Sequence, residues 1–415
     1  MRRLTLTLVL TLPLLAPTPT HAQVDEDRLE ELKVEAQAMV QDNAKMVQEI
    51  IDMLFSFGEL GMQEFETQRY LTGLLEEHGF EIELGVAGMP SAWTARWGSG
   101  SPVIALGSDV DGIPQSNQKP GVGYQEPILD LAPGHGEGHN SGQAVNIVAA
   151  LAVKDIMERE GISGTLLIWP GVAEEQVASK AYFVREGVFD GVDVNLFTHV
   201  SSNYGMSWGQ AGGNALWSVQ FKFNGATAHS AGSPWRGRSA LDAAMLMAQA
   251  WEFKREHLQP AARSHYIIVD GGDQPNVVPQ RSTIWFYFRE RDYDGTKAMY
   301  DAAVKMAEGA ALMTGTEVDT IMTVGAAYGR HFSKPVAEAT YANIQAVGLP
   351  EWSEADQTLA RALQEELDVE VRGLADSIPE LRGPVDLSRS LGGGSDDIGD
   401  VSWNMPTVTF RYPSN

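Results

Sequence analysis

Short continuous apolar runs recur in the first half of the chain. They occupy residues 103–106, 165–169 and 194–198, and this length is typical of buried strands. Stretches with apolar residues at helical spacing separate the runs, notably residues 140–157 and 178–186. Buried strands that alternate with helices favour a mostly parallel sheet covered on both faces. The pattern therefore predicts an α/β fold for this part of the chain.

Helical spacing also marks segments outside this alternation. Residues 24–57 combine recurrent apolar positions with many charges, which predicts one long amphipathic surface helix. A second helix passes through Leu71 and stops at Gly79. Near the other end, a helix over residues 354–367 precedes a glycine-rich loop at residues 392–397. We expect the first of these helices to have a structural role.

The pattern changes near Gly212, where alternating residues replace the continuous runs. Residues 216–223 alternate in the manner of a half-exposed antiparallel strand. The elements expected after it are a helix, two strands, a helix and a strand, at residues 239–257, 266–269, 283–288, 296–313 and 317–324. This β-α-β-β-α-β order is ferredoxin-like. We therefore expect a ferredoxin-like α+β domain at residues 213–327, inserted into a domain formed by residues 23–212 and 328–415.

Length and charge narrow the class of protein. The chain has 415 residues, 43% of them hydrophobic, which suits a soluble protein of two or three domains. Its formal net charge of −25 is spread along the chain, so we expect neither a nucleic acid nor a membrane partner. The chain contains no cysteine, which excludes disulfides and thiolate ligands. Any metal site must therefore use histidine, aspartate and glutamate.

The first 22 residues have the features of a signal peptide. Two arginines at residues 2–3 precede an apolar run at residues 4–16 and small residues up to Ala22. The apolar run is too short for a transmembrane helix. We expect cleavage after Ala22 and a secreted or periplasmic mature protein.

Acidic and imidazole side chains come directly after the apolar strands. They are Asp109 and Asp111, Glu174 and Glu175, and His199. The carboxyl ends of parallel strands meet at one edge of a sheet, where open α/β proteins bind ligands. We therefore expect these side chains to lie close together.

The segment Gly134–Asn140 contains two imidazoles and a carboxylate, from His135, Glu137 and His139, separated by glycines. Glycines let the backbone turn tightly around a small ligand. Imidazole and carboxylate are usual ligands of zinc. A flexible polar loop with solvated histidines is the alternative. Together with the groups at the strand ends, the segment favours a divalent metal site.

Two further features suggest catalysis. The side chains of the adjacent residues Glu174 and Glu175 must diverge, so one carboxylate can bind a metal while the other takes a proton from a water that the metal activates. A surface pair of glutamates is the alternative. His229 lies among small residues in a loop after a strand, which would allow it to approach a substrate closely.

In this order, these segments resemble the co-catalytic zinc hydrolase family that includes aminoacylase and carboxypeptidase G. The matching residues are Glu59-Leu60-Gly61 with Glu64 and Thr67, Asp109-Val110-Asp111 before Pro114, Gly134–Asn140, Glu174-Glu175, His199, Ala228-His229-Ser230, Asn276–Pro279, and Gly394-Ser395 with Asp397. Residues 233–243 and 399–403 look most like the aminobenzoyl-glutamate hydrolase B-subunit type. The resemblance covers almost the whole mature chain. It implies a catalytic domain with a lid at residues 213–327 through which two copies form a homodimer.

The resemblance also implies roles for individual residues. The implied metal ligands are Glu137, His139, Glu175 and His199. The general base would be Glu174, with Asp111 orienting a ligand histidine, which we expect to be His139. From the lid, His229 and Asn276 would reach the partner subunit's active site to stabilise the oxyanion, and Arg289 would grip the substrate carboxylate. Further candidates are His135 and Asp109.

The chain departs from this family at two points. Related amidohydrolases usually carry a cysteine where Glu137 stands, so a site made only of oxygen and nitrogen ligands makes manganese an alternative to zinc. The family also supplies a metal-binding histidine after the Gly-Ser-Asp loop, whereas this chain has no histidine after His331. We therefore expect a shortened C-terminal part, and two metals per active site in the complete protein.

The resemblance predicts a metal-dependent amidohydrolase. Its expected substrate is an N-acyl or N-aroyl amino acid of the aminobenzoyl-glutamate kind, attacked by a water that the metal activates. A dipeptidase or carboxypeptidase acting on unblocked peptides is one alternative. A non-catalytic scaffold or binding module that retained the fold is the other.

Overall fold

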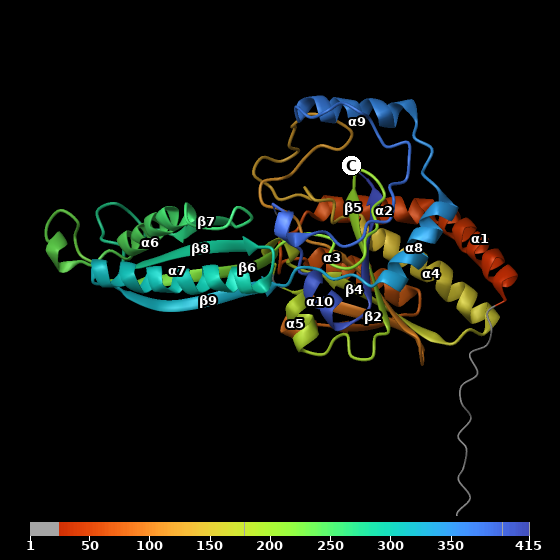
Figure 1. Cartoon of the computed structure of the whole chain (residues 1–415), viewed down its shortest axis with the longest axis horizontal. Coiled ribbons are helices and arrows are strands. Elements are labelled where there is room, and N and C mark those ends of the chain that lie inside the picture. The colour runs from red at the N-terminus through yellow and green to blue at the C-terminus, as the bar shows by residue number, and fades with distance from the viewer. Residues whose placement is uncertain (1–24, 178, 392, 415) are drawn as a thin grey trace, which may run out of the picture.

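The computed structural model of the chain describes residues 25–177, 179–391 and 393–414. The expected signal peptide and its cleavage site after Ala22 lie outside these residues. The described residues form a larger main domain and an elongated lid that projects from one side of it (Figure 1). Each is built around its own sheet and its own hydrophobic core.

The main domain contains a six-stranded sheet. In spatial order its strands are β1 (Glu81–Leu84), β2 (Trp93–Ser99), β4 (Gly164–Gly171), β3 (Val103–Asp109), β5 (Val194–Ser201) and β10 (Thr407–Pro413). The strands from β4 to β10 run parallel, whereas β1 and β2 add an antiparallel edge. The three continuous apolar runs form the central strands β3, β4 and β5, and β4 is buried along its whole length. The predicted mostly parallel sheet is therefore confirmed, and β1, β2 and β10 extend it beyond the runs seen in the sequence.

Helices pack around this sheet. The central helix α4 (Gly142–Glu160) contacts β3, β4 and β5, and it carries α1 (Glu26–Asp42) and α2 (Ala44–Phe57) on its outer side. The remaining helices of the main domain are α3 (Phe65–Glu77), α5 (Lys180–Arg185), α8 (Lys334–Val347), α9 (Glu354–Glu366) and α10 (Ile398–Asn404). Of these, α5 and α10 contact each other beside the lid.

The expectation of one continuous helix over residues 24–57 is wrong. The chain leaves helical geometry at Asn43, which separates α1 from α2. The Asn43 side-chain amide donates a hydrogen bond to the Met39 carbonyl at 2.8 Å, so it satisfies a backbone group at the end of α1. Only α2 buries side chains, Ile50 and Leu54. A periodic pattern passes through such a break because the apolar positions continue on both sides of it.

The lid is an antiparallel four-stranded sheet covered by two helices on one face. Its elements in chain order are β6 (Ala215–Asn224), α6 (Ala240–Arg255), β7 (Arg263–Asp270), β8 (Arg281–Glu290), α7 (Tyr293–Thr314) and β9 (Glu317–Ala327). The spatial order is β7-β8-β6-β9. Trp251 on α6 packs against Phe286 and Phe288 on β8. The predicted ferredoxin-like order is confirmed.

Several side-chain hydrogen bonds join the lid to the main domain, including those of Asn214 to Gly393, Arg263 to Leu391 and Arg291 to Ser390. Tyr182 on α5 donates to the Val324 carbonyl on β9 at 3.0 Å. From β8, Tyr287 donates to the Glu175 carbonyl at 2.9 Å, and Arg289 contacts the Ser395 hydroxyl at 3.4 Å. The base of the lid therefore lies directly against the loops at the carboxyl edge of the main sheet.

Among the described residues, no helix is both long enough and apolar enough to cross a bilayer.

Candidate metal centre

The carboxyl edge of the main sheet gathers most of the side chains that the sequence singled out. Asp109 is the last residue of β3, His199 lies within β5, and the glutamate pair follows β4. His139 comes from the loop before α4. Ligand atoms of Glu137, His139 and Glu175 lie within 4.8 Å of one another, and so do those of Asp109, His139 and His199. The structure thus places the four residues implied as metal ligands in two groups that share His139.

The ring of His139 is held in one orientation by Asp111. Its Nδ1 lies 3.0 Å from the Asp111 carbonyl oxygen and 3.4 Å from the Asp111 carboxylate. A nitrogen that faces two oxygens carries the hydrogen in the neutral ring. The lone pair is then on Nε2, which is buried and has no hydrogen-bond partner. His139 therefore presents an unused nitrogen ligand, oriented by an acidic residue behind it.

Charge at this centre also fits a divalent cation. Burial raises the pKa of Glu175 to about 7, against the attraction of His139, and its Oε1 is buried without a hydrogen bond. Burial opposes the charged form of His139, but the hydrogen bond to Asp111 and the nearby carboxylates outweigh it and raise the pKa of His139 to about 9. Without a cation, protons would have to offset the buried negative charge. Buried carboxylate and imidazole groups with unused ligand atoms match the donors that zinc and manganese accept.

His199, on β5, lies against the ring of His139. Their ring centroids are 5.3 Å apart in an edge-to-face arrangement. Burial, followed by the charge of Arg411, lowers the pKa of His199 to about 4. The imidazole is therefore neutral at neutral pH, and the neutral form is the one that binds metals.

The turn that carries Glu174 and Glu175 is fixed by two buried acids. Glu64 accepts hydrogen bonds from the Ala173 amide at 2.8 Å and from the Ser91 hydroxyl at 2.6 Å. Asp111 accepts one from the Glu175 amide at 3.0 Å. The residues on either side of the turn, Ala173 and Val177, both have left-handed backbone angles, with φ of 51° and 53°. Such strained residues persist only where their surroundings determine them, and here these carboxylates do so.

The two glutamates point to different partners. Glu175 joins the group of Glu137 and His139, whereas a carboxylate oxygen of Glu174 lies within 4.8 Å of those of Asp109 and Asp396. Burial raises the pKa of Glu174 well above its usual range, and the charge of Asp109 adds to this effect. A buried carboxylate that readily accepts a proton is suited to act as a general base.

A buried lysine that the sequence analysis missed lies beside Glu174. The Lys180 side chain is fully buried, and its Nζ lies 2.7 Å from Asp109, 2.5 Å from Asp397 and 3.4 Å from Asp396. It also sits 4.8 Å from the centre of the Phe197 ring. Its ammonium group joins the end of β3 to the Gly-Ser-Asp loop and to the start of α5. A single lysine in a short helix has no pattern that would reveal this role.

The close approach of the Asp109 carboxylate to the Gly171 backbone explains why this position is a glycine. A Cβ atom on Gly171, at the end of β4, would lie 2.0 Å from the Asp109 carboxylate. Only glycine leaves room there for Asp109 to reach Lys180.

Other candidate residues do not belong to the two ligand groups. His135 contacts the Leu54 carbonyl through Nε2 at 3.0 Å and belongs to neither ligand group. The loop after β6 and the loop between β7 and β8 lie at the end of the lid remote from the main domain (Figure 1). His229 belongs to the first loop and Asn276 to the second, and a bridge between His229 and Val277 joins the two loops. His229 Nδ1 accepts hydrogen bonds from the Ala231 and Gly232 amides, which leaves the hydrogen of the neutral ring on Nε2. Within one chain, these two residues do not reach the metal centre.

Replacing Lys180 with methionine is expected to destabilise the protein by about 3–5 kcal/mol, because it leaves buried carboxylates without their cation. Burial already raises the pKa of Asp109 from 3.8 to about 7, although Lys180 counteracts it. An acid whose pKa is higher in the folded protein loses folding stability as the pH rises through that interval. The loss in Lys180→Met should therefore be smaller at pH 5 than at pH 8 in denaturant unfolding.

Two further variants test this electrostatic explanation. Lys297→Met removes an exposed ion pair with Asp301 on α7 and should change the stability little. Lys180→Met combined with Asp397→Asn should recover part of the loss, because one buried charge disappears with the lysine. A pH-independent loss without such recovery would point to packing instead.

Comparison with known proteins agrees with this arrangement. Residues 213–312 match the peptidase dimerisation domain. The B subunit of the p-aminobenzoyl-glutamate hydrolase of Escherichia coli is 32% identical over 387 residues, which cover 88% of this chain and 80% of that protein. A crystal structure of an aminobenzoyl-glutamate utilization protein from Klebsiella pneumoniae matches 91% of this chain and 93% of its own, with a TM-score of 0.63 at 17% identity.

A second solved structure comes from a named family. A dinuclear metal-binding peptidase of the M20 family from Bacillus subtilis matches 88% of each chain, with a TM-score of 0.51 at 18% identity. The structural matches show the shared fold, and the sequence identity to the Escherichia coli protein extends over most of both chains. The resemblance expected from the sequence is confirmed. The chain therefore belongs to the M20 family of metal-dependent peptidases and amidohydrolases.

Proposed function

We propose that the protein hydrolyses the amide bond of N-acyl or N-aroyl amino acids, of which aminobenzoyl-glutamate is the model. The observation that carries the proposal is the position of Glu174. Its buried carboxylate lies beside a group of metal-binding donors, and Arg289 on β8 of the lid contacts Ser395 close by. The similarity to one of the subunits of an aminobenzoyl-glutamate hydrolase supports this substrate class.

Glu137, His139, Glu175 and His199 would hold the metal. A divalent cation there supplies a Lewis acid that polarises the amide carbonyl and acidifies water. We propose zinc or manganese, because all the donors are oxygen or nitrogen. The division of the donors into more than one group of three supports two cations per site.

Glu174 performs the proton transfers. As a base it takes a proton from the attacking water, and the raised pKa that burial gives it lets the carboxyl hold this proton. It then donates the proton to the nitrogen of the leaving amino acid. Asp111 and Glu64 keep the turn in place during both transfers, since they bind the backbone amides on either side of Glu174.

Arg289 would bind the substrate carboxylate. The net charge of −25 gives no long-range attraction for an anionic substrate, so recognition depends on a local cation. The Arg289 Nε is buried without a hydrogen-bond partner, and its only described side-chain hydrogen bond is the long one to Ser395. A guanidinium group with free donors suits a carboxylate.

The proposal includes a homodimer formed through the lid. His229 and Asn276 lie at the far end of the lid, so only a second copy could bring them to this site. Because its Nδ1 accepts two backbone hydrogen bonds, His229 presents Nε2–H, a donor that could stabilise a developing oxyanion. The match to a peptidase dimerisation domain supports this assembly. A secreted or periplasmic location, expected from the N-terminal residues, completes the proposal.

Glu174→Gln should lower kcat for N-(4-aminobenzoyl)glutamate by about 10²–10⁴-fold, because the amide cannot accept a proton. Metal content, measured by elemental analysis, should remain that of the wild type, since Glu174 is not one of the proposed ligands. Glu186→Gln, which changes an exposed carboxylate at the end of α5, is the matched control and should retain full activity. Equal activity in Glu174→Gln and wild type would overturn the mechanism.

Removing metal with a chelator should abolish amide hydrolysis, and titration with zinc and with manganese separately identifies the cation that restores it. His139→Ala should bind less metal per chain than wild type. His257→Ala, outside the cluster, should bind the same amount. A chelated protein that keeps its activity would exclude the proposed role of the metal.

Mixing two inactive variants tests the homodimer. Glu174→Gln and His229→Ala each disable a different half of the composite site. In randomly mixed dimers, half of the molecules carry one variant of each kind, and one of their two sites is intact, so about 25% of wild-type activity should return. Co-expression with separate tags provides the mixture. Activity no greater than that of the separate variants would contradict a site shared between subunits.

A further inference from the structure

The two lid helices leave one face of the lid sheet open. Next to the main domain this face is covered, because Leu216, Ala327 and Tyr287 pack with Val177, and the open part begins beyond that contact. Alternate residues of β8 point to opposite faces, so Phe286 and Phe288 pack under the helices while Trp285 and Tyr287 point to the open side. On β7, Ile267 is paired in register with Trp285, and His265 with Tyr287. An antiparallel sheet face directed to solvent is usually polar, whereas this part of the face carries the aromatic and aliphatic side chains Trp285, Tyr287 and Ile267.

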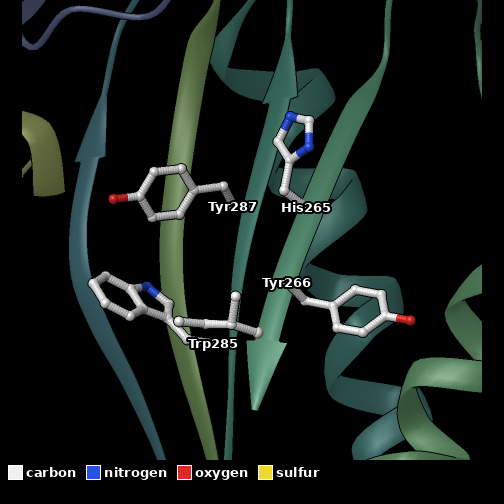
Figure 2. A pocket seen from close by; sticks show the side chains of 5 residues that line it. His265, Tyr266, Trp285 and Tyr287 are labelled. Atoms are coloured by element: carbon white, nitrogen blue, oxygen red, sulfur yellow. The ribbon is translucent and has the colours of Figure 1, made fainter. Parts of the chain in front are cut away.

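A hollow of about 220 Å³ is lined by His265, Tyr266, Ile267, Trp285 and Tyr287. Figure 2 shows Trp285 and Tyr287 projecting together from β8, with Tyr266 directed away from them. Tyr266 packs instead against Phe286, 5.0 Å between ring centroids, under the helices. The lining of the hollow on the open side is therefore Trp285, Tyr287, Ile267 and His265.

The aromatic side chains of the hollow are fixed by their polar ends. Trp285 Nε1 donates to the Ser218 hydroxyl at 2.9 Å, and the Tyr287 hydroxyl donates to the Glu175 carbonyl at 2.9 Å. Their ring centroids are 5.7 Å apart with planes at 73°. Since the polar groups of Trp285 and Tyr287 are used, these two side chains offer mainly their ring faces, beside the Ile267 side chain and the His265 imidazole. Such a surface favours a flat apolar group.

The hollow lies beside the turn that carries the glutamate pair. Tyr287 forms its inner wall and touches the backbone of Glu175, a proposed metal ligand. Arg289 follows on the same face of β8, and Arg263 is its partner in register on β7. Outward from the main domain, the sheet face thus presents a pair of guanidinium groups and then the aromatic hollow. A molecule that combines a carboxylate with an aromatic ring matches this sequence of groups.

We propose that Trp285, Tyr287 and Ile267 form a subsite for an aromatic ring of the substrate, beside the carboxylate-binding Arg289. This inference rests on the proposed function and specifies its substrate class. The ring can belong to the acyl group or to the amino acid side chain, and both sources share the same chemistry. The size of the hollow suits one ring, whereas a stable protein partner buries about 800 Å² of each surface.

Binding to the metal-loaded Glu174→Gln protein tests the subsite without turnover. Calorimetry compares N-acetylglycine with N-benzoylglycine, which has a ring on the acyl side, and with N-acetylphenylalanine, which has one on the amino acid side. At least one aromatic ligand should bind about 10-fold more tightly than N-acetylglycine. Equal affinity for all three ligands overturns the subsite. The tighter aromatic ligand identifies which half of the substrate lies in the hollow.

Two substitutions test whether the hollow causes the preference for aromatic ligands. Trp285→Ala removes one wall, and Ile267→Trp fills the hollow from an exposed position that tolerates change. Both should abolish the aromatic preference and leave the affinity for N-acetylglycine unchanged. Ile268→Trp, on the neighbouring residue that does not line the hollow, should keep the preference. An aromatic preference that survives both substitutions overturns the assignment, as does an equal loss of affinity for all ligands.

Two separate measurements keep this inference distinct from the proposed function. Wild-type hydrolysis of the same three compounds reports the proposed function, whereas the binding comparison reports the subsite. An aromatic preference without hydrolysis supports the subsite and contradicts the function, and hydrolysis without a preference does the reverse. Gel filtration of Ile267→Trp tests whether the hollow is a contact between copies. A changed oligomeric state with an unchanged ligand preference overturns the subsite.

Discussion

Four carboxylates surround a single ammonium group at the carboxyl edge of the main sheet. Asp109, Asp396 and Asp397 contact Lys180, and Glu174 lies within reach of its charge. One positive charge cannot balance four buried negative charges, and burying an unbalanced charge is costly. The negative charge that Lys180 does not balance is offset by protons or by cations. Burial, together with the charges of neighbouring carboxylates, raises the pKa values of Asp109, Glu174 and Asp397. A divalent cation at the metal centre would therefore offset buried negative charge as well as serve the chemistry.

Much of the fold could be predicted from the spacing of apolar residues, because burial imposes that spacing directly. The central strands and the order of elements in the lid follow from it. The short edge strand β1 and the C-terminal strand β10 could not be predicted in this way, since each buries too few residues to stand out from its surroundings. The break at Asn43 was also invisible. It depends on one side-chain hydrogen bond, while the apolar period continues on both sides.

The site could be predicted where its functional residues lie close together in the sequence. Gly134–Asn140 and the glutamate pair concentrate unusual residues in few positions, and the strand ends supplied a geometric reason for their convergence. Lys180 and Tyr287 carry no such signal. Lys180 becomes significant only when the Gly-Ser-Asp loop, more than 200 residues later, folds onto it. The contact of Tyr287 depends on how the lid meets the main domain, which no local pattern specifies.

The hydrogen bonds at the base of the lid have a mechanical consequence. Tyr182, Tyr287 and Arg289 each make one of them, and that of Arg289 to Ser395 is the longest of the three. A ligand that takes the Arg289 guanidinium competes with Ser395 for the same donor. Occupancy of the site is thereby linked to the contact between the lid and the main domain. Because Tyr287 on the same strand binds the Glu175 carbonyl, a change in the position of β8 would also reach the backbone beside the general base.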